Sequence, residues 1–200
     1  KAQIAREAGL EPLADALLAD PALVPDEAAA EYCNDAVADA AAALDGARHI
    51  LIERAGEDAE LVGTVREKFW TAGRLGTTPK SEEVAATPAG QKFRDYFDFS
   101  ESLDTMPGHR VLAVLRGEKE GVLTLAFDGG DDEDYITMVA ATLGIDRAAG
   151  GAATEWLATT ARWAWRTKLL ISATIDARMR LRGRAEEQAV AVFATNLKDL

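Results

Sequence analysis

The fold is decided between residues 92 and 127, where KFRDYFDFSES (92–102) leads through a proline to HRVLAVLRGEKEGVLTLAF (109–127). Phe93, Tyr96 and Phe97 are three and four positions apart, so a helix there would carry three rings on one face. Such a face anchors a helix to a core. The alternative is a platform on which bases stack, but Asp95 and Asp98 stand among the rings and would repel phosphates. Packing is therefore favoured over nucleic-acid stacking.

The second half of this stretch predicts a helix followed by a strand. Pro107 can open the helix, since proline suits the first helical position. Residues 111–115 form a continuous apolar run, whereas residues 122–127 alternate between larger and smaller side chains, as a strand does. A hairpin that pairs 110–115 with 122–127 is the competing interpretation.

Most of the remaining chain shows helical periodicity. Residues 1–20 predict two short helices about a turn at Gly9, with Pro12 opening the second. Asp45 and Gly46 are predicted to interrupt a long alanine-rich helix. The other predicted helices cover residues 25–44, 47–55, 57–72, 135–143, the region from 154 onward, and 189–200. The fold class is therefore mainly α, a multi-helix orthogonal assembly with at most one short strand or hairpin near 110–127.

The first two predicted helices have the spacing of a helix-turn-helix. A DNA-reading version needs Arg, Asn or Gln on its second helix to contact base edges. Glu11, Ala14, Asp15 and Leu18 stand there instead. Because carboxylates oppose phosphates, a DNA-reading role is not expected.

Two segments lack periodicity. Residues 73–90, GRLGTTPKSEEVAATPAG, predict a surface loop, and they do not match the phosphate-loop pattern G-x-x-x-x-G-K-[ST]. Residues 128–134, DGGDDED, are strongly acidic. An EF-hand loop would need an acid at its twelfth position, where Val139 stands, so a solvated turn is predicted.

Trp156, Trp163 and Leu170 recur every seven residues in the longest helical pattern. That spacing places them on one side of a helix. We therefore predict that both tryptophans are buried and structural.

Composition limits the function. The chain has 22 Lys plus Arg against 34 Asp plus Glu in 200 residues, a net charge of −12, so it lacks the basic footprint of a stand-alone nucleic-acid binder. Its single cysteine, Cys33, excludes an internal disulfide and suits a reducing cytosol. No apolar run approaches about 18 residues and no signal peptide is seen, so a cytoplasmic protein without a membrane partner is expected. Because the first residue is Lys1, we expect a fragment of a longer chain.

The basic residues concentrate in one region. Alternate arginines on a helix lie about 200° apart and fall on two faces. Asp176 can pair with Arg180, and Arg182 with Glu186, at i,i+4. A paired, solvated surface is favoured, and a weak nucleic-acid patch is the alternative. The candidate nucleic-acid-binding residues are Arg162, Arg166, Lys168, Arg178, Arg180, Arg182 and Arg184.

No catalytic constellation is found. His49 has only Glu53 on its helical face, and His109 stands beside Arg110. One histidine and one carboxylate do not make a metal site. We therefore expect no enzymatic activity, no metal and no cofactor.

Four stretches, in this order, resemble one family. They are KAQIAREAGLEPLAD (1–15), KFRDYFDFSES (92–102), HRVLAVLRGEKEGVL (109–123) and LLISATIDARMRLRGRAEEQAVAVFATNLKDL (169–200). They are similar to the helical N-terminal region of Tex, a family of bacterial transcription accessory proteins with a C-terminal S1 domain. The resemblance covers nearly the whole chain. Residues 73–90 depart from the more basic segment that is usual in the family.

The resemblance implies that residues 1–200 are a helical scaffold. In the family, this region precedes ribonuclease-H-like, helix-hairpin-helix and S1 domains, which are expected beyond residue 200. The parent would bind RNA or DNA, mainly through those domains, and act with the transcription machinery. The alternative is a protein–protein interaction scaffold without nucleic-acid contact.

Overall fold

The computed structural model describes residues 1–199. Two compact units make up the chain, and each is built from two separate stretches. Unit 1 comprises Lys1–Val65 and Asp131–Ser172. Unit 2 comprises Arg66–Gly130 and the chain from Ala173 onward.

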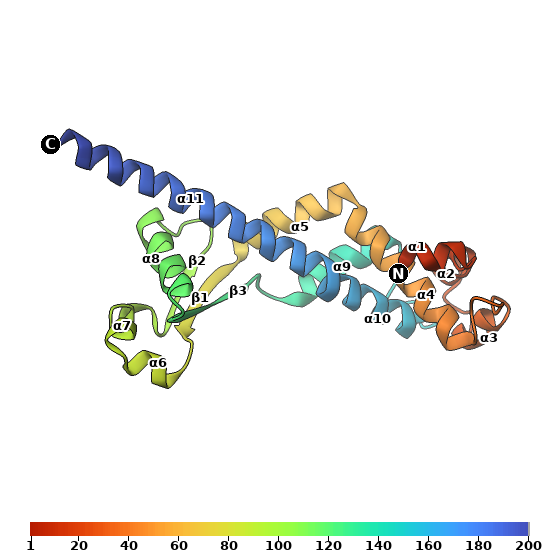
Figure 1. Ribbon diagram of the computed structural model, residues 1–200. Coiled ribbons are helices and arrows are strands. Elements are labelled where there is room, and N and C mark those ends of the chain that lie inside the picture. Colours follow the sequence, from red (N-terminus) through yellow and green to blue (C-terminus); the bar gives the residue numbers. More distant parts are fainter. Residues whose placement is uncertain (200) are drawn as a thin grey trace. The chain divides into compact units, whose positions relative to one another are not determined.

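Unit 1 is built from helices around α4 (Ala40–Glu57), which contacts α1, α2, α3, α9, α10 and η2 (Figure 1). Its core includes Leu13, Leu17, Ile50 and Leu157, all fully buried. The other elements are α1 (Ala2–Glu7), α2 (Glu11–Ala19), α3 (Pro25–Ala30), the beginning of α5 (Ala59–Ala72), α9 (Asp132–Leu143), α10 (Thr154–Ala164), the π-helical turn η2 (Trp165–Leu169) and the first residues of α11 (Leu170–Lys198).

The predicted turn at Gly9 is confirmed, since its φ of +83° is a left-handed conformation that glycine adopts readily. The predicted break at Asp45 and Gly46 is wrong, because α4 runs through it. A β-carbon on Gly46 would lie 2.3 Å from Leu10 Cδ1, so this glycine allows close packing within a continuous helix. The interruption comes earlier, and Asp39 caps α4 by accepting a 2.8 Å hydrogen bond from the Ala42 amide.

The buried tryptophan of unit 1 is Trp165. Its ring stacks on Tyr135 with centroids 4.2 Å apart, and its Nε1 donates to Asp132 Oδ1 at 2.9 Å. The predicted burial of both tryptophans is wrong, because Trp156 is only half-buried and 43% of the Trp163 side chain is exposed. Leu157 and Ala164 have the same seven-residue spacing one position further on, and these residues occupy the buried face.

Unit 2 contains a three-stranded antiparallel sheet in the order β2-β1-β3, with α8 against β3 (Figure 1). In the central strand, Leu75 is fully buried and pairs with Glu101 on one side and Phe127 on the other. The elements are the rest of α5, β1 (Arg74–Pro79), α6 (Glu82–Ala86), α7 (Pro88–Gln91), the 3₁₀ turn η1 (Arg94–Tyr96), β2 (Phe99–Ser102), α8 (Gly108–Lys119), β3 (Leu123–Asp128) and most of α11.

The mainly α fold class is confirmed, and so is the order of helix then strand in 108–128. The predicted loop at 73–90 is wrong over β1, which is the centre of the sheet and not a surface connection. Its partners lie far along the chain, so no local pattern signals it. The predicted helix near Phe93 is also wrong. Residues 94–96 form a single 3₁₀ turn, after which Tyr96 meets Phe99 edge to face at 5.2 Å.

The predicted turn at 128–134 is confirmed for residues 129–131, whereas residues 132–134 form the first turn of α9, three residues before the predicted start of that helix. Asp128 accepts a hydrogen bond from the Gly130 amide, and Asp131 caps α9 by accepting from the Glu133 amide. Within the described part of the chain, no helix has both the length and the apolar character needed to span a bilayer.

Candidate nucleic-acid interface

The predicted basic residues are divided between the two units. Those of unit 2 lie on α11 and those of unit 1 on α10 and η2. Their contacts decide which of them remain available to a phosphate.

Arg178 is fixed by a carboxylate and a ring. Its guanidinium donates to both oxygens of Glu118, at 2.6 and 3.0 Å, and lies 5.2 Å from the centre of the Phe127 ring. Bidentate pairs of this kind are among the stronger hydrogen-bonded contacts. Arg178 therefore joins α11 to α8 and β3 within unit 2.

Arg180 lies between two acids. It pairs with Glu67 of α5 and, at 2.9 Å, with Asp176 one turn before it, as the i,i+4 spacing predicted. The hydrogen bond with Glu67 raises the pKa of Arg180 and lowers the pKa of Glu67. The ring of Trp70 lies 5.4 Å from the guanidinium carbon. Arg180 is thus already paired with two carboxylates of unit 2.

Arg184 holds a loop by its backbone. Its two terminal nitrogens donate to the carbonyls of Leu103, Asp104 and Met106 at 3.0, 3.1 and 2.7 Å. Only a planar fork with several donors can reach three carbonyls in this way. Arg184 therefore fixes the connection between β2 and α8, while Arg182 on the same helix is exposed.

The three candidates of unit 1 have different surroundings. Arg162 donates to Glu155 at 2.7 Å and to Thr159 at 2.8 Å, and it lowers the pKa of the Glu155 carboxyl. Arg166 and Lys168 lie on η2 with exposed side chains. Lys168 and Arg166, with Arg182 of unit 2, are therefore the candidates most accessible to a phosphate.

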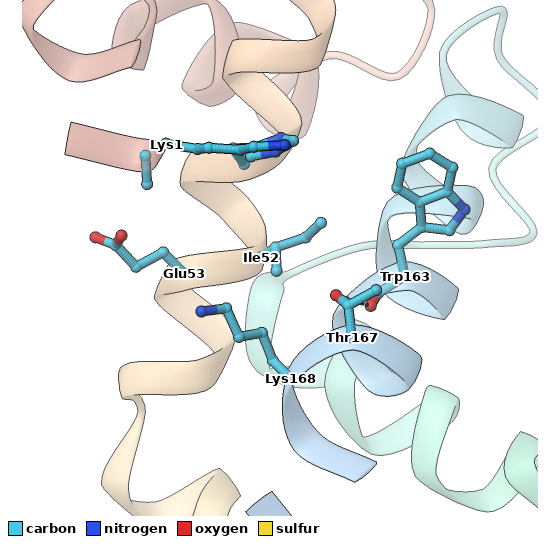
Figure 2. A pocket seen from close by; sticks show the side chains of 8 residues that line it. Lys1, Ile52, Glu53, Trp163, Thr167 and Lys168 are labelled. Atoms are coloured by element: carbon cyan, nitrogen blue, oxygen red, sulfur yellow. Dashed lines mark hydrogen bonds between the residues drawn. The ribbon is translucent and has the colours of Figure 1, made fainter. Parts of the chain in front are cut away.

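Lys168 lines a pocket of about 440 Å³ in unit 1. Figure 2 shows its side chain directed across this space toward α4, which carries Glu53. Glu53 is paired with Arg6, and that hydrogen bond is the main cause of its lowered pKa, with the charge of Lys168 adding to it. The lining consists of Lys1, Ala2, His49, Ile52, Glu53, Trp163, Thr167 and Lys168.

Trp163 is held at the pocket by an arginine that the sequence analysis did not single out. Arg48 lies between two indoles, 4.8 Å from the centre of Trp156 and 5.0 Å from that of Trp163. It donates to Thr160 Oγ1 at 3.0 Å and to the Trp156 carbonyl at 3.3 Å. Burial lowers the pKa of Arg48. A single arginine on the neighbouring helix gives no sequence signal of this arrangement.

The π-helical turn brings Trp163 and Lys168 to the same pocket. In a regular α-helix, residues five apart are about 140° apart around the axis. In η2 the Leu170 amide instead donates to the carbonyl five residues before it, that of Trp165. The wider turn therefore brings residues five positions apart, here Trp163 and Lys168, toward the same side of the helix. Turns of this kind are frequent at functional sites.

Other chemistry is sparse. In residues 1–199, no cluster of three histidine, cysteine or acidic side chains could hold a metal ion. His49 Nδ1 lies 2.9 Å from the Asp45 carbonyl oxygen of its own helix. Cys33 is exposed and lies outside the helices.

Comparison with known proteins identifies the family. A family model described as Tex central region-like matches residues 20–193. The chain belongs to the Tex central region-like family. It is 45% identical to the Protein tex of Bordetella pertussis, to the Transcriptional accessory protein Tex of Neisseria gonorrhoeae and to the Protein YhgF of Escherichia coli. Each comparison covers 100% of the chain and 26% of the relative.

The resemblance inferred from sequence is thereby confirmed at the level of the Tex family. The family model names a central region where the sequence analysis expected an N-terminal one. The chain spans about a quarter of the length of the Tex relatives it matches.

Proposed function

We propose that this chain is the helical scaffold of a Tex-like transcription accessory protein and that it has no catalytic activity. In this proposal, the parent is a cytoplasmic protein that binds RNA or other nucleic acid mainly through residues outside this chain. The observation that carries the proposal is that most of the candidate arginines on α11 already have partners within unit 2. Arg178, Arg180 and Arg184 contact groups of their own unit. The net charge of −12 further weakens attraction to phosphates.

A comparison of the isolated chain with its full-length parent tests this proposal. Fluorescence anisotropy with a labelled single-stranded RNA is expected to show binding by the parent and little or no binding by residues 1–200 at physiological salt. Replacing Arg178 and Arg182 together in the parent should reduce the salt slope by at most about two contacts, each about 0.7 for a single strand. Tight, salt-resistant binding by the isolated chain would contradict the scaffold role.

A second candidate function is a protein–protein interaction scaffold without nucleic-acid contact. It is favoured by the last turns of α11, where Val190, Phe193 and Leu197 are 67%, 65% and 56% exposed. These residues are three and four positions apart and share a helix face. Exposed apolar stripes of this kind suit association with another protein surface. If the parent failed to bind RNA or DNA at low salt, this candidate would replace the first.

A further inference from the structure

We infer that the pocket between α1, α4, α10 and η2 of unit 1 holds one nucleotide of a single-stranded nucleic acid, with its base against Trp163 and its phosphate at Lys168. The inference rests on the proposed function, in which the parent binds nucleic acid, and adds a minor contact made by this chain. The pocket's volume of about 440 Å³ is within the usual range for small-molecule sites, about 300–1,000 Å³.

The aromatic part of the site is exposed and rigid. Trp163 is 43% exposed and lines the pocket, while Arg48, which does not line it, covers another part of the indole. The contact with Arg48 holds the ring in place, so little conformational entropy is lost when a base stacks on it. Stacking on an aromatic side chain is the usual way that proteins hold single-stranded bases without reading their sequence.

The cationic part of the site is also positioned by its surroundings. A β-carbon on Gly56 would lie 3.6–3.7 Å from three carbons of the Lys168 side chain, so this stem runs past α4 where that helix has no side chain. The adjacent Thr167 offers a hydroxyl, although this group donates at 2.6 Å to the Trp163 carbonyl. A cation beside an exposed indole is the combination that suits a phosphate and its base.

The acid in the pocket does not cancel this charge. Glu53 is the one carboxylate among the lining residues of this pocket, and Arg6 already pairs with it. The lysine therefore remains available to an anion. An acidic peptide would also be attracted to Lys168, but its carboxylates would make no stacking contact with the indole. The exposed Trp163 therefore favours a nucleotide.

The test measures anisotropy of fluorescein-labelled oligouridylate with the full-length protein at about 50 mM salt, where phosphate contacts are strong. Trp163→Ala is expected to weaken binding by at least about fivefold, the lower end of the loss of one stacked base. Lys168→Ala should lower the magnitude of the salt slope by about 0.7. Lys92→Ala, an exposed lysine of unit 2, is the charge-matched control and should change neither.

Each other result overturns the inference in a distinct way. Unchanged affinity in Trp163→Ala and Lys168→Ala, with RNA binding by the parent intact, would remove this site and leave the proposed function standing. An equal loss in Lys92→Ala would show a general charge effect. Lys168-dependent binding of poly-glutamate that ignores Trp163 would assign the pocket to an acidic protein. Absence of RNA binding by the parent would remove the proposed function as well. Trp163→Phe, with the thermal midpoint of every variant, separates loss of the ring from loss of the fold.

Discussion

Replacement of the two neighbouring tryptophans of unit 1 by alanine tests which face of the helix is buried. Trp165 is 1% exposed and Trp163 is 43% exposed. Removing a buried tryptophan costs about 3–5 kcal/mol of unfolding free energy. Trp165→Ala also removes the stack on Tyr135 and the donor to Asp132. For Trp163→Ala we expect about 1–2 kcal/mol, from partial burial and the lost contact with Arg48.

The assay is scanning calorimetry with a parallel urea titration. For a chain of this size, 1 kcal/mol shifts the midpoint by about 2–4 °C, so Trp165→Ala should lower it by on the order of 10 °C. Trp165→Phe is the matched control, because it keeps a ring against Tyr135 and loses the Nε1 donor, at about 1 kcal/mol for the hydrogen bond. If Trp163→Ala destabilised the chain as much as Trp165→Ala, the assignment of the buried face would be wrong.

Three further outcomes are expected. Gly117→Ala should destabilise unit 2 by about 1–2 kcal/mol in a thermal melt, because its β-carbon would lie 2.5 Å from a side-chain carbon of Leu123. Gly183→Ala on α11 is the control: its β-carbon would meet nothing within 4 Å, and the change should stabilise the helix by up to about 1 kcal/mol. Arg184→Lys should cost about 1–3 kcal/mol in urea unfolding, since an ammonium cannot reach all three carbonyls. The hydrogen bond from Arg110 lowers the pKa of the Glu101 carboxyl in the folded state. The stabilisation that this pair gives the fold is therefore present above the unfolded pKa of about 4.3 and is lost as the pH falls through the folded pKa. Glu101→Gln should flatten the curve of unfolding free energy against pH between about pH 5 and 3.

The sequence was informative where one local rule decided the structure. The alternation at 122–127 predicted β3, and Gly9 predicted its own turn. Residues 74–79 failed as a prediction because a strand with glycine, threonine and proline is formed by its partners, and both partners lie more than 20 residues away. The same applies to Gly46, whose role depends on Leu10, the residue that precedes α2.

The candidate site was predictable only in part. The i,i+4 pair of Asp176 and Arg180 follows from spacing and was found. The partners of Arg178 and Arg184 lie 60 or more residues away in sequence, so the sequence could not separate committed arginines from accessible ones. The π turn has no composition signal, and therefore the placement of Trp163 and Lys168 at one pocket could not be predicted.

That π turn also has a consequence for evolution. A turn closed by five residues holds one residue more than the α-helical turn it replaces, so it is the kind of change that a single-codon insertion or deletion makes or removes. A homologue one residue shorter between Trp163 and Lys168, with a regular α-helix there, would have the tryptophan and the lysine four positions apart, about 40° around the axis, and so still on one side of the helix. A homologue of the same length without the π turn would instead direct them about 140° apart, so the length of this segment and the form of its turn together decide which relatives keep both residues at the pocket.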